Sequence, residues 1–232
     1  LRVSGSALLL IELNRPWDAE ILVRTNTEAT LVFCHLLGDK NKFEERFEEY
    51  TNSLPDISAL ADHSKAKRLL EVRGTPKESK DRSIEDLLLS PNEYERISDL
   101  YPRKERSKIK NAWGFTSIVE NMVRSGESFG ENAAALLHGY SISSHVSHSD
   151  YLGISIVAER ENRNDERRIA MHEAHSARIL SDILWSQFFR LNAAYKFLGK
   201  KTDDLNSFVD SDLVIWRTIK SLEQKWSDIE YG

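Results

Sequence analysis

The stretch PWDAEILVRTNTEATLVFCHLLG, from Pro16 to Gly38, decides the fold class of this chain. Proline is common at the first position of a helix, because its nitrogen carries no hydrogen that would be left unpaired, and glycine is common just past the last position. Between these two residues the apolar side chains recur at the spacing of helical turns. The stretch therefore predicts a long helix from Trp17 to about Leu37, which Gly38 ends.

The rest of the chain follows the same pattern. Glycine and proline are scarce, at 10 and 5 residues, and they separate long segments with a helical period rather than short alternating ones. We therefore predict an all-α multi-helix bundle. The further helices are expected at 6–13, 42–51, 56–72, 83–89, 91–100, 103–124 with a break at Gly114, 131–148, 165–198 and 207–229.

Two segments depart from this helical pattern. The stretch GTPKESKDR at 74–82 is polar and carries no apolar side chain, so it is the candidate break between subdomains in what we predict to be a single helical domain, residues 1–232. The stretch YLGISIVA at 151–158 is rich in β-branched residues, which favour a short strand or an extended connector.

Composition limits the classes of function. The net charge of -5 gives no overall attraction for nucleic acid or for an anionic membrane, so any such binding must depend on a local patch. The longest apolar run, Ala7 to Ile11, is far shorter than the roughly 20 residues of a membrane span. Cys34 is the single cysteine, which excludes an internal disulfide and suits a reducing compartment. We expect a cytoplasmic protein without a membrane segment.

Arg24 and Glu28 place opposite charges on the helical stripe that is expected to face the core. Burying such groups costs several kcal/mol, on the order of 2 to 7, unless they find partners. One interpretation is a buried ion pair that fixes helix packing. The other is a binding site, in which the planar guanidinium of Arg24 holds a phosphate or carboxylate and Glu28 orients it.

A second polar stripe lies in a histidine-rich part of the chain, where five of the seven histidines fall between His138 and His175. On the helix predicted for 131–148, one face begins with apolar residues and continues with Tyr140, Ser144 and His148. This gradient indicates either a buried hydroxyl and imidazole network or a cleft at the carboxyl end of the helix. There, His148 would accept a proton as a base.

Two weaker patterns, a zinc site and a catalytic triad, are disfavoured. A zinc site is disfavoured because neither HExxH nor CxxC occurs, and we expect no metal and no cofactor. A triad of Ser144, His148 and Asp150 is disfavoured because helical neighbours rarely align as one and no GxSxG elbow is present. The histidine pairs that could hold a metal are His145 with His148 and His172 with His175.

Two further features could act on RNA. Arg168 and His175 enclose six residues, and Arg167 and His172 enclose four, so both pairs fit an R-x(4–6)-H pattern. The run RKERSKIK is either a guide for a phosphate backbone or a solvated helix face. Its basic residues are Arg103, Lys104, Arg106, Lys108 and Lys110.

In two places the chain resembles a bacterial family of helical proteins related to the HEPN superfamily. The first is an L-x-R-x-x-x-E helix and the second a Y-x-x-x-S-x-x-x-H helix, and together they cover roughly the first 40 residues and 130–150. The resemblance implies an all-α bundle and frequent dimerisation. For many HEPN members it also implies metal-independent endoribonuclease activity in toxin-antitoxin, abortive-infection or other anti-phage systems. The matching residues are Leu22, Arg24, Glu28, Tyr140, Ser144 and His148.

The chain departs from the usual HEPN pattern, in which the arginine and histidine of R-x(4–6)-H share one helix. The helix that carries His148 has no such arginine, so Arg24 replaces it, or Arg168 and His175 form the motif, or the chain is an inactive binding relative. We expect a HEPN-like endoribonuclease that acts as a toxin or defence effector. The alternative is a noncatalytic interaction or sensor module. The expected partners are RNA, a second copy of the chain and an antitoxin or defence protein.

Overall fold

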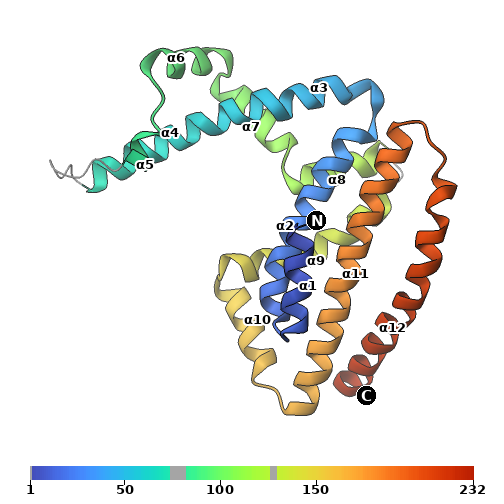
Figure 1. Ribbon diagram of the computed structural model, residues 1–232. Helices are drawn as coiled ribbons and strands as arrows, with labels where there is room; N and C mark the ends of the chain where they lie inside the picture. Colours follow the sequence, from blue (N-terminus) through green and yellow to red (C-terminus); the bar gives the residue numbers. More distant parts are fainter. Residues whose placement is uncertain (1, 74–81, 126–129) are drawn as a thin grey trace. The chain divides into compact units, whose positions relative to one another are not determined.

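The computed structural model describes residues 2–73, 82–125 and 130–232. These residues form helices and their connections, with no strand among them, so the predicted all-α multi-helix fold is confirmed (Figure 1). The chain divides into two compact units, Leu1–Lys40 with Ile118–Gly232 and Asn41–Ser117. The candidate break at 74–82 falls inside the second unit and, except for its last residue, lies outside the described residues.

The first unit is built around two long helices, α2 and α11. Helix α11 packs against α1, α2, α10 and α12, and α2 also packs against α1 and α9. Figure 1 shows α12 running back along α11 after the turn η3. None of the described helices is long and apolar enough to cross a bilayer. The helices are α1 (Arg2–Glu12), α2 (Pro16–Gly38), α9 (Gly130–His148), α10 (Tyr151–Glu161), α11 (Asp165–Phe197), η3 (Thr202–Leu205) and α12 (Asn206–Tyr231), with most of α8 (Phe115–Arg124).

Helix α2 forms where its sequence predicts, but the side that it buries is different. Arg24 and Glu28, which are predicted to face the core, lie at the margin of the buried surface, and Ile21 on the same side of the helix is 39% exposed. The buried side instead carries small side chains, which let α1 and α11 approach closely. It also carries a fully buried carboxylate, Glu20. A core cluster on this side joins Ala7, Ala19, Val23, Ile179 and Ile183.

The predicted strand or connector at 151–158 is wrong, because this stretch begins helix α10. Ser149 takes a left-handed backbone conformation that ends α9. Asp150 then caps α10 by accepting a hydrogen bond of 3.0 Å from the backbone nitrogen of Gly153. A satisfied cap stabilises a helix by about 1 kcal/mol. The β-branched residues therefore extend a helix that the cap and the turn have started.

We expect Gly153→Ala to lower the free energy of unfolding by about 1 to 3 kcal/mol, the range for overpacking. A Cβ at Gly153 would lie 2.2 Å from the backbone oxygen of His145, so α9 and α10 would have to separate. Gly5→Ala is the matched control, because a Cβ at Gly5 meets nothing within 4 Å and alanine is the better helix former. Urea unfolding measures both variants, and equal effects would contradict the close contact.

The second unit is organised around α4, which packs against η2, α5, α6 and α7. Ser90 and Glu93 form a capping box at the start of α6, where Pro91 takes the first position. The predicted break at Gly114 is confirmed, since α7 ends at Ala112 and α8 begins at Phe115. The elements are α3 (Phe43–Glu48), a π-helical turn η2 (Glu49–Ser53), α4 (Leu54–Arg73), α5 (Arg82–Glu85), α6 (Pro91–Leu100) and α7 (Arg103–Ala112).

Candidate functional site

Arg24 joins α2 to the carboxyl-terminal half of α9 in the first unit. Its Nε donates to Glu28 Oε1 at 3.1 Å, its Nη2 donates to the hydroxyl of Tyr140 at 3.2 Å, and its Nη1 donates to Ser147. The guanidinium also lies over the Tyr140 ring, 4.9 Å from its centroid. The Tyr140 hydroxyl in turn donates to Glu28 Oε1 at 2.9 Å. Arg24, Glu28, Tyr140 and Ser147 thus form one polar network, which we call the Arg24 network.

The Arg24 network leaves hydrogen-bonding capacity for a ligand. A guanidinium carries five N–H donors, and three of those of Arg24 are used by the contacts above. The Arg24 side chain remains 16% exposed and that of Glu28 41%. Burial raises the pKa of Tyr140, so its hydroxyl stays protonated at neutral pH and can keep donating to Glu28. The network therefore holds the arginine in place without using all of its N–H groups.

The structure places the remaining predicted residues of this set beside the network rather than in it. Ser147, which the sequence pattern did not single out, contacts Arg24, whereas Ser144 contributes only its backbone oxygen, to Ser147. His148 directly follows Ser147 at the end of α9, is exposed, and makes no hydrogen bond with the described residues. Asp150 pairs with His145 at 2.6 Å, so the disfavoured triad with His148 does not form.

A second cluster surrounds the buried carboxylate of Glu20, which is 1% exposed. Its Oε2 accepts from His175 Nε2 at 2.8 Å and also contacts Arg178, while Oε1 accepts from the hydroxyl of Ser143. Arg178 makes a further ion pair with Asp182 at 2.7 Å. We call Glu20, Ser143, His175, Arg178 and Asp182 the Glu20 cluster. It joins α2, α9 and α11, and neither of its two acidic members was predicted.

The environment of the Glu20 cluster fixes the charge of its members. Burial alone would raise the pKa of Glu20, but the hydrogen bond from His175 and the charge of Arg178 hold it at about 2. Burial lowers the pKa of His175 against the opposing effect of Glu20. Because Glu20 is ionised and carries no proton, the shared proton lies on His175 Nε2, and Nδ1 is left as an acceptor.

The pKa of Asp182, which burial raises to about 6, predicts a pH-dependent stability. Since the folded state holds this proton more tightly than the unfolded chain, the contribution of Asp182 to stability falls as pH rises from about 4 to about 6. We expect Asp182→Asn to remove this loss. The free energy of unfolding of the variant relative to wild type should then increase between pH 4.5 and pH 7.

Urea unfolding at several pH values measures this difference. The expected change is on the order of 1 to 3 kcal/mol, from 1.36 kcal/mol per pKa unit. A difference between the two proteins that stays constant with pH would contradict the assignment to Asp182.

The alternative pair Arg168 and His175 is not brought together. Arg168 pairs with Asp165 at 2.7 Å, two turns of α11 away from His175, which pairs with Glu20. Arg167 pairs with Glu230 of α12 at 2.6 Å, and His172 Nε2 pairs with Glu161 at 2.6 Å. Among the described residues no three His, Cys, Asp or Glu side chains group as metal ligands.

The predicted basic run forms α7 in the second unit. Arg103, Lys104, Lys108 and Lys110 are exposed, whereas Arg106 is partly buried. Lys108 lies 3.4 Å from Glu105, so part of its charge is balanced on the same helix. Helix α7 thus presents four exposed cations, which fits either the predicted phosphate contacts or a solvated face.

The fold and the polar networks define the first unit as an all-helical module with charged side chains at its helix contacts. Residues 1–166 match the profile of DUF5677, a family of unknown function, and the chain belongs to this family. The matched segment includes the Arg24 network and His148, whereas His175, Arg178 and Asp182 lie beyond it. A search of curated proteins and a search of solved structures each found no significant match.

A weak sequence pattern marks the position of Glu20. Small residues at Ala19, Val23, Thr30 and Cys34 recur at helical spacing on α2, and Glu20 lies next to them. A stripe of small side chains marks the closest helix contact. A carboxylate beside such a stripe is therefore a better candidate for burial than Glu28, which lies beside larger side chains.

Proposed function

We propose that this protein is a metal-independent, HEPN-like endoribonuclease that acts as a toxin or an anti-phage defence effector. One observation carries the proposal. Arg24 of α2 is fixed against α9 at Ser147, the residue before the exposed His148. Helices far apart in sequence thus bring two groups to the same end of α9: a guanidinium whose N–H donors the described residues do not all use, and an exposed imidazole. A base and a cation of this kind can catalyse transfer at phosphorus.

In the proposed reaction, His148 removes the proton from the 2′-hydroxyl of RNA. The resulting oxygen attacks the adjacent phosphorus, the bond to the 5′-oxygen breaks, and that oxygen takes a proton from water. His148 later returns its own proton to the solvent. Arg24 stabilises the charge that develops on the phosphoryl oxygens. The products are a 2′,3′-cyclic phosphate and a 5′-hydroxyl.

Glu28 and Tyr140 act as positioning residues in this proposal. Both bind Arg24, and Tyr140 also binds Glu28, so the guanidinium loses less conformational freedom when a phosphate binds. Ser144, one turn before His148, is proposed to contact the phosphate. The exposed cations of α7 are proposed to bind the RNA backbone outside the reacting phosphate.

The resemblance that motivates the activity also implies partners. We propose a homodimer, and an antitoxin or defence protein that controls the activity in the cytoplasm. Light scattering on the purified chain tests the dimer, and a monomer at micromolar concentration would contradict it.

Incubation of the purified protein with total RNA and with transfer RNA tests the activity. EDTA is present throughout, and the ends of the products are identified chemically. We expect cleavage that leaves 2′,3′-cyclic phosphates and depends on His148. Absence of cleavage on both substrates, or cleavage that survives His148→Ala, would overturn the proposal.

The second candidate is a noncatalytic interaction or sensor module. It is favoured by the pairing of Arg24 with Glu28, Tyr140 and Ser147, which satisfies three N–H donors within the protein as in a packing network. In that case the wild-type protein would not cleave RNA, and Arg24→Ala would only lower the stability of the fold. The same assay therefore separates the two candidates.

A further inference from the structure

A pocket of about 390 Å³ lies in the first unit on the side of α9 away from the Arg24 network. It is formed by α2, α9, α10, α11 and α12, and its volume is within the usual range for small-molecule sites. Gly139 and Ile142 give its wall on α9, whereas Tyr140 and Ser147 face Arg24. Nothing in the proposed ribonuclease reaction uses this pocket.

One wall of the pocket presents a cation that makes no ion pair with the described residues. The guanidinium of Arg160, on α10, lies 5.6 Å from the centre of the Trp17 ring. The nearby guanidinium groups of Arg163 and Arg178 are each paired with carboxylates. Arg160 is therefore the cation of this wall that is available for an anion. The planar guanidinium can hold a phosphate through two hydrogen bonds.

Two polar atoms of residues that line the pocket are buried and lack partners among the described residues, Nδ1 of His175 and Nε1 of Trp226. Both are closed to solvent, so they do not open into the pocket. A ligand would therefore meet the rings of these side chains rather than these two atoms.

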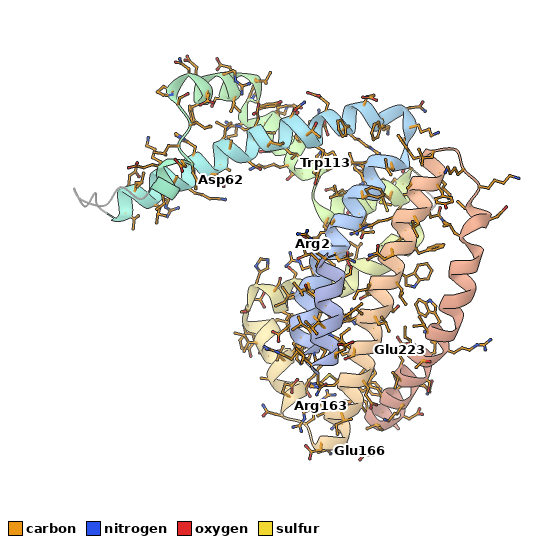
Figure 2. All side chains as sticks on the ribbon, viewed as in Figure 1. Arg2, Asp62, Trp113, Arg163, Glu166 and Glu223 are labelled. Carbon is orange, nitrogen blue, oxygen red and sulfur yellow. The ribbon has the colours of Figure 1, made fainter. Side chains whose placement is uncertain are left out.

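The remaining walls are aromatic, apolar and acidic. Trp17 and Trp226 offer ring surfaces on which a base can stack. Glu223 of α12, labelled in Figure 2, adds a carboxylate that can accept hydrogen bonds from hydroxyl groups. The pocket thus combines a cation, a carboxylate and aromatic surfaces.

We propose that this pocket binds a ribonucleoside monophosphate. Arg160 binds the phosphate, Glu223 accepts from the ribose hydroxyls, and the base lies against the tryptophan rings. This site is separate from the Arg24 network and does not depend on the ribonuclease activity.

Calorimetric titration of the full chain with AMP, CMP, GMP and UMP tests the proposal. We expect at least one of them to bind with a dissociation constant between about 10 µM and 1 mM, as for a small ligand of this size. Adenosine and inorganic phosphate, each lacking one half of the ligand, should bind at least about 10-fold more weakly.

Two variants assign the binding to this pocket. Arg160→Gln should weaken it by about 10- to 100-fold, and Trp226→Leu, which removes the aromatic surface, by about 5- to 100-fold. Arg124→Gln is the matched control, because Arg124 is 70% exposed on α8 and pairs with Glu120. His148→Ala should leave nucleotide binding unchanged.

Circular dichroism confirms that each variant is folded before titration. Three results would overturn the proposal: no binding of any of the four nucleotides at about 1 mM, equal binding of inorganic phosphate, or undiminished binding to a folded Arg160→Gln variant.

Discussion

Glu20→Gln is expected to lower the free energy of unfolding by about 3 to 5 kcal/mol, the range for removing one partner of a buried ion pair. Glu20 is 1% exposed and receives hydrogen bonds from Ser143, His175 and Arg178. A neutral amide offers one acceptor where the carboxylate offers two, and it no longer balances the charge of Arg178. Its NH2 group would also face donors that it cannot bind. Because a domain of this size is stable by about 5 to 15 kcal/mol, such a loss is a large part of the total.

The pH dependence of stability should change in the same variant. The pKa of Glu20 is held at about 2 in the folded protein, below its ordinary value of 4.5. Its contribution to stability is therefore present above pH 4.5 and is lost as pH falls from about 4.5 to about 2. Wild type should show this loss and Glu20→Gln should not, once the overall difference in stability is subtracted.

Glu173→Gln is the matched control for the Glu20 substitution. Glu173 pairs with Lys225 at 2.7 Å, but both side chains are exposed, by 40% and 52%. Exposed pairs contribute about 0 to 1 kcal/mol, because water solvates the separated charges well. Chemical unfolding measures both variants, and similar small effects would show that the Glu20 carboxylate contributes little.

His148→Ala is expected to reduce RNA cleavage by about 10²- to 10⁴-fold, the usual contribution of a general base. His148 is exposed at the end of α9 and makes no hydrogen bond with the described residues, so the variant should fold as wild type. The loss should appear in the rate at saturating RNA rather than in RNA affinity, because the imidazole acts on a proton in the transition state.

His145→Ala gives the comparison that isolates this effect. His145 lies on the same helix one turn earlier and pairs with Asp150 at 2.6 Å in a partly exposed position. Removing it costs a surface interaction of about 0 to 1 kcal/mol and should leave cleavage near the wild-type rate. If the two variants lost activity equally, or if neither did, His148 would not be the base.

The sequence predicted the helices well where proline and glycine marked the ends of a segment whose apolar side chains recur at the helical period. It predicted them less well where local propensity dominated. Pro16 and Gly38 define the ends of α2, and the break near Gly114 separates α7 from α8. The β-branched stretch 151–158 was misassigned, because the cap from Asp150 and the close contact at Gly153 outweigh its strand propensity. A propensity worth tenths of a kcal/mol per residue is easily reversed by such tertiary contacts.

The candidate site was predicted in part. The meeting of Arg24, Glu28 and Tyr140 followed from two polar stripes on helices expected to face a common core, and the structure brings these three together. The sequence suggested Ser144 as the serine on this face of α9, but Ser147 makes the contact with Arg24. Positions three residues apart on a helix differ by about 60° around its axis, and only the packing partner decides between them.

By itself, the sequence determined that the chain is all-helical and where most of the helices begin and end. These properties depend on local periodicity and on caps, which act over one or two turns. Only the tertiary structure decided that Glu20, rather than Glu28, is the buried carboxylate, that it meets His175 and Arg178, and that a pocket forms beside them. Which face of a helix is buried depends on the neighbours that cover it, and the partners of Glu20 come from segments more than a hundred residues away.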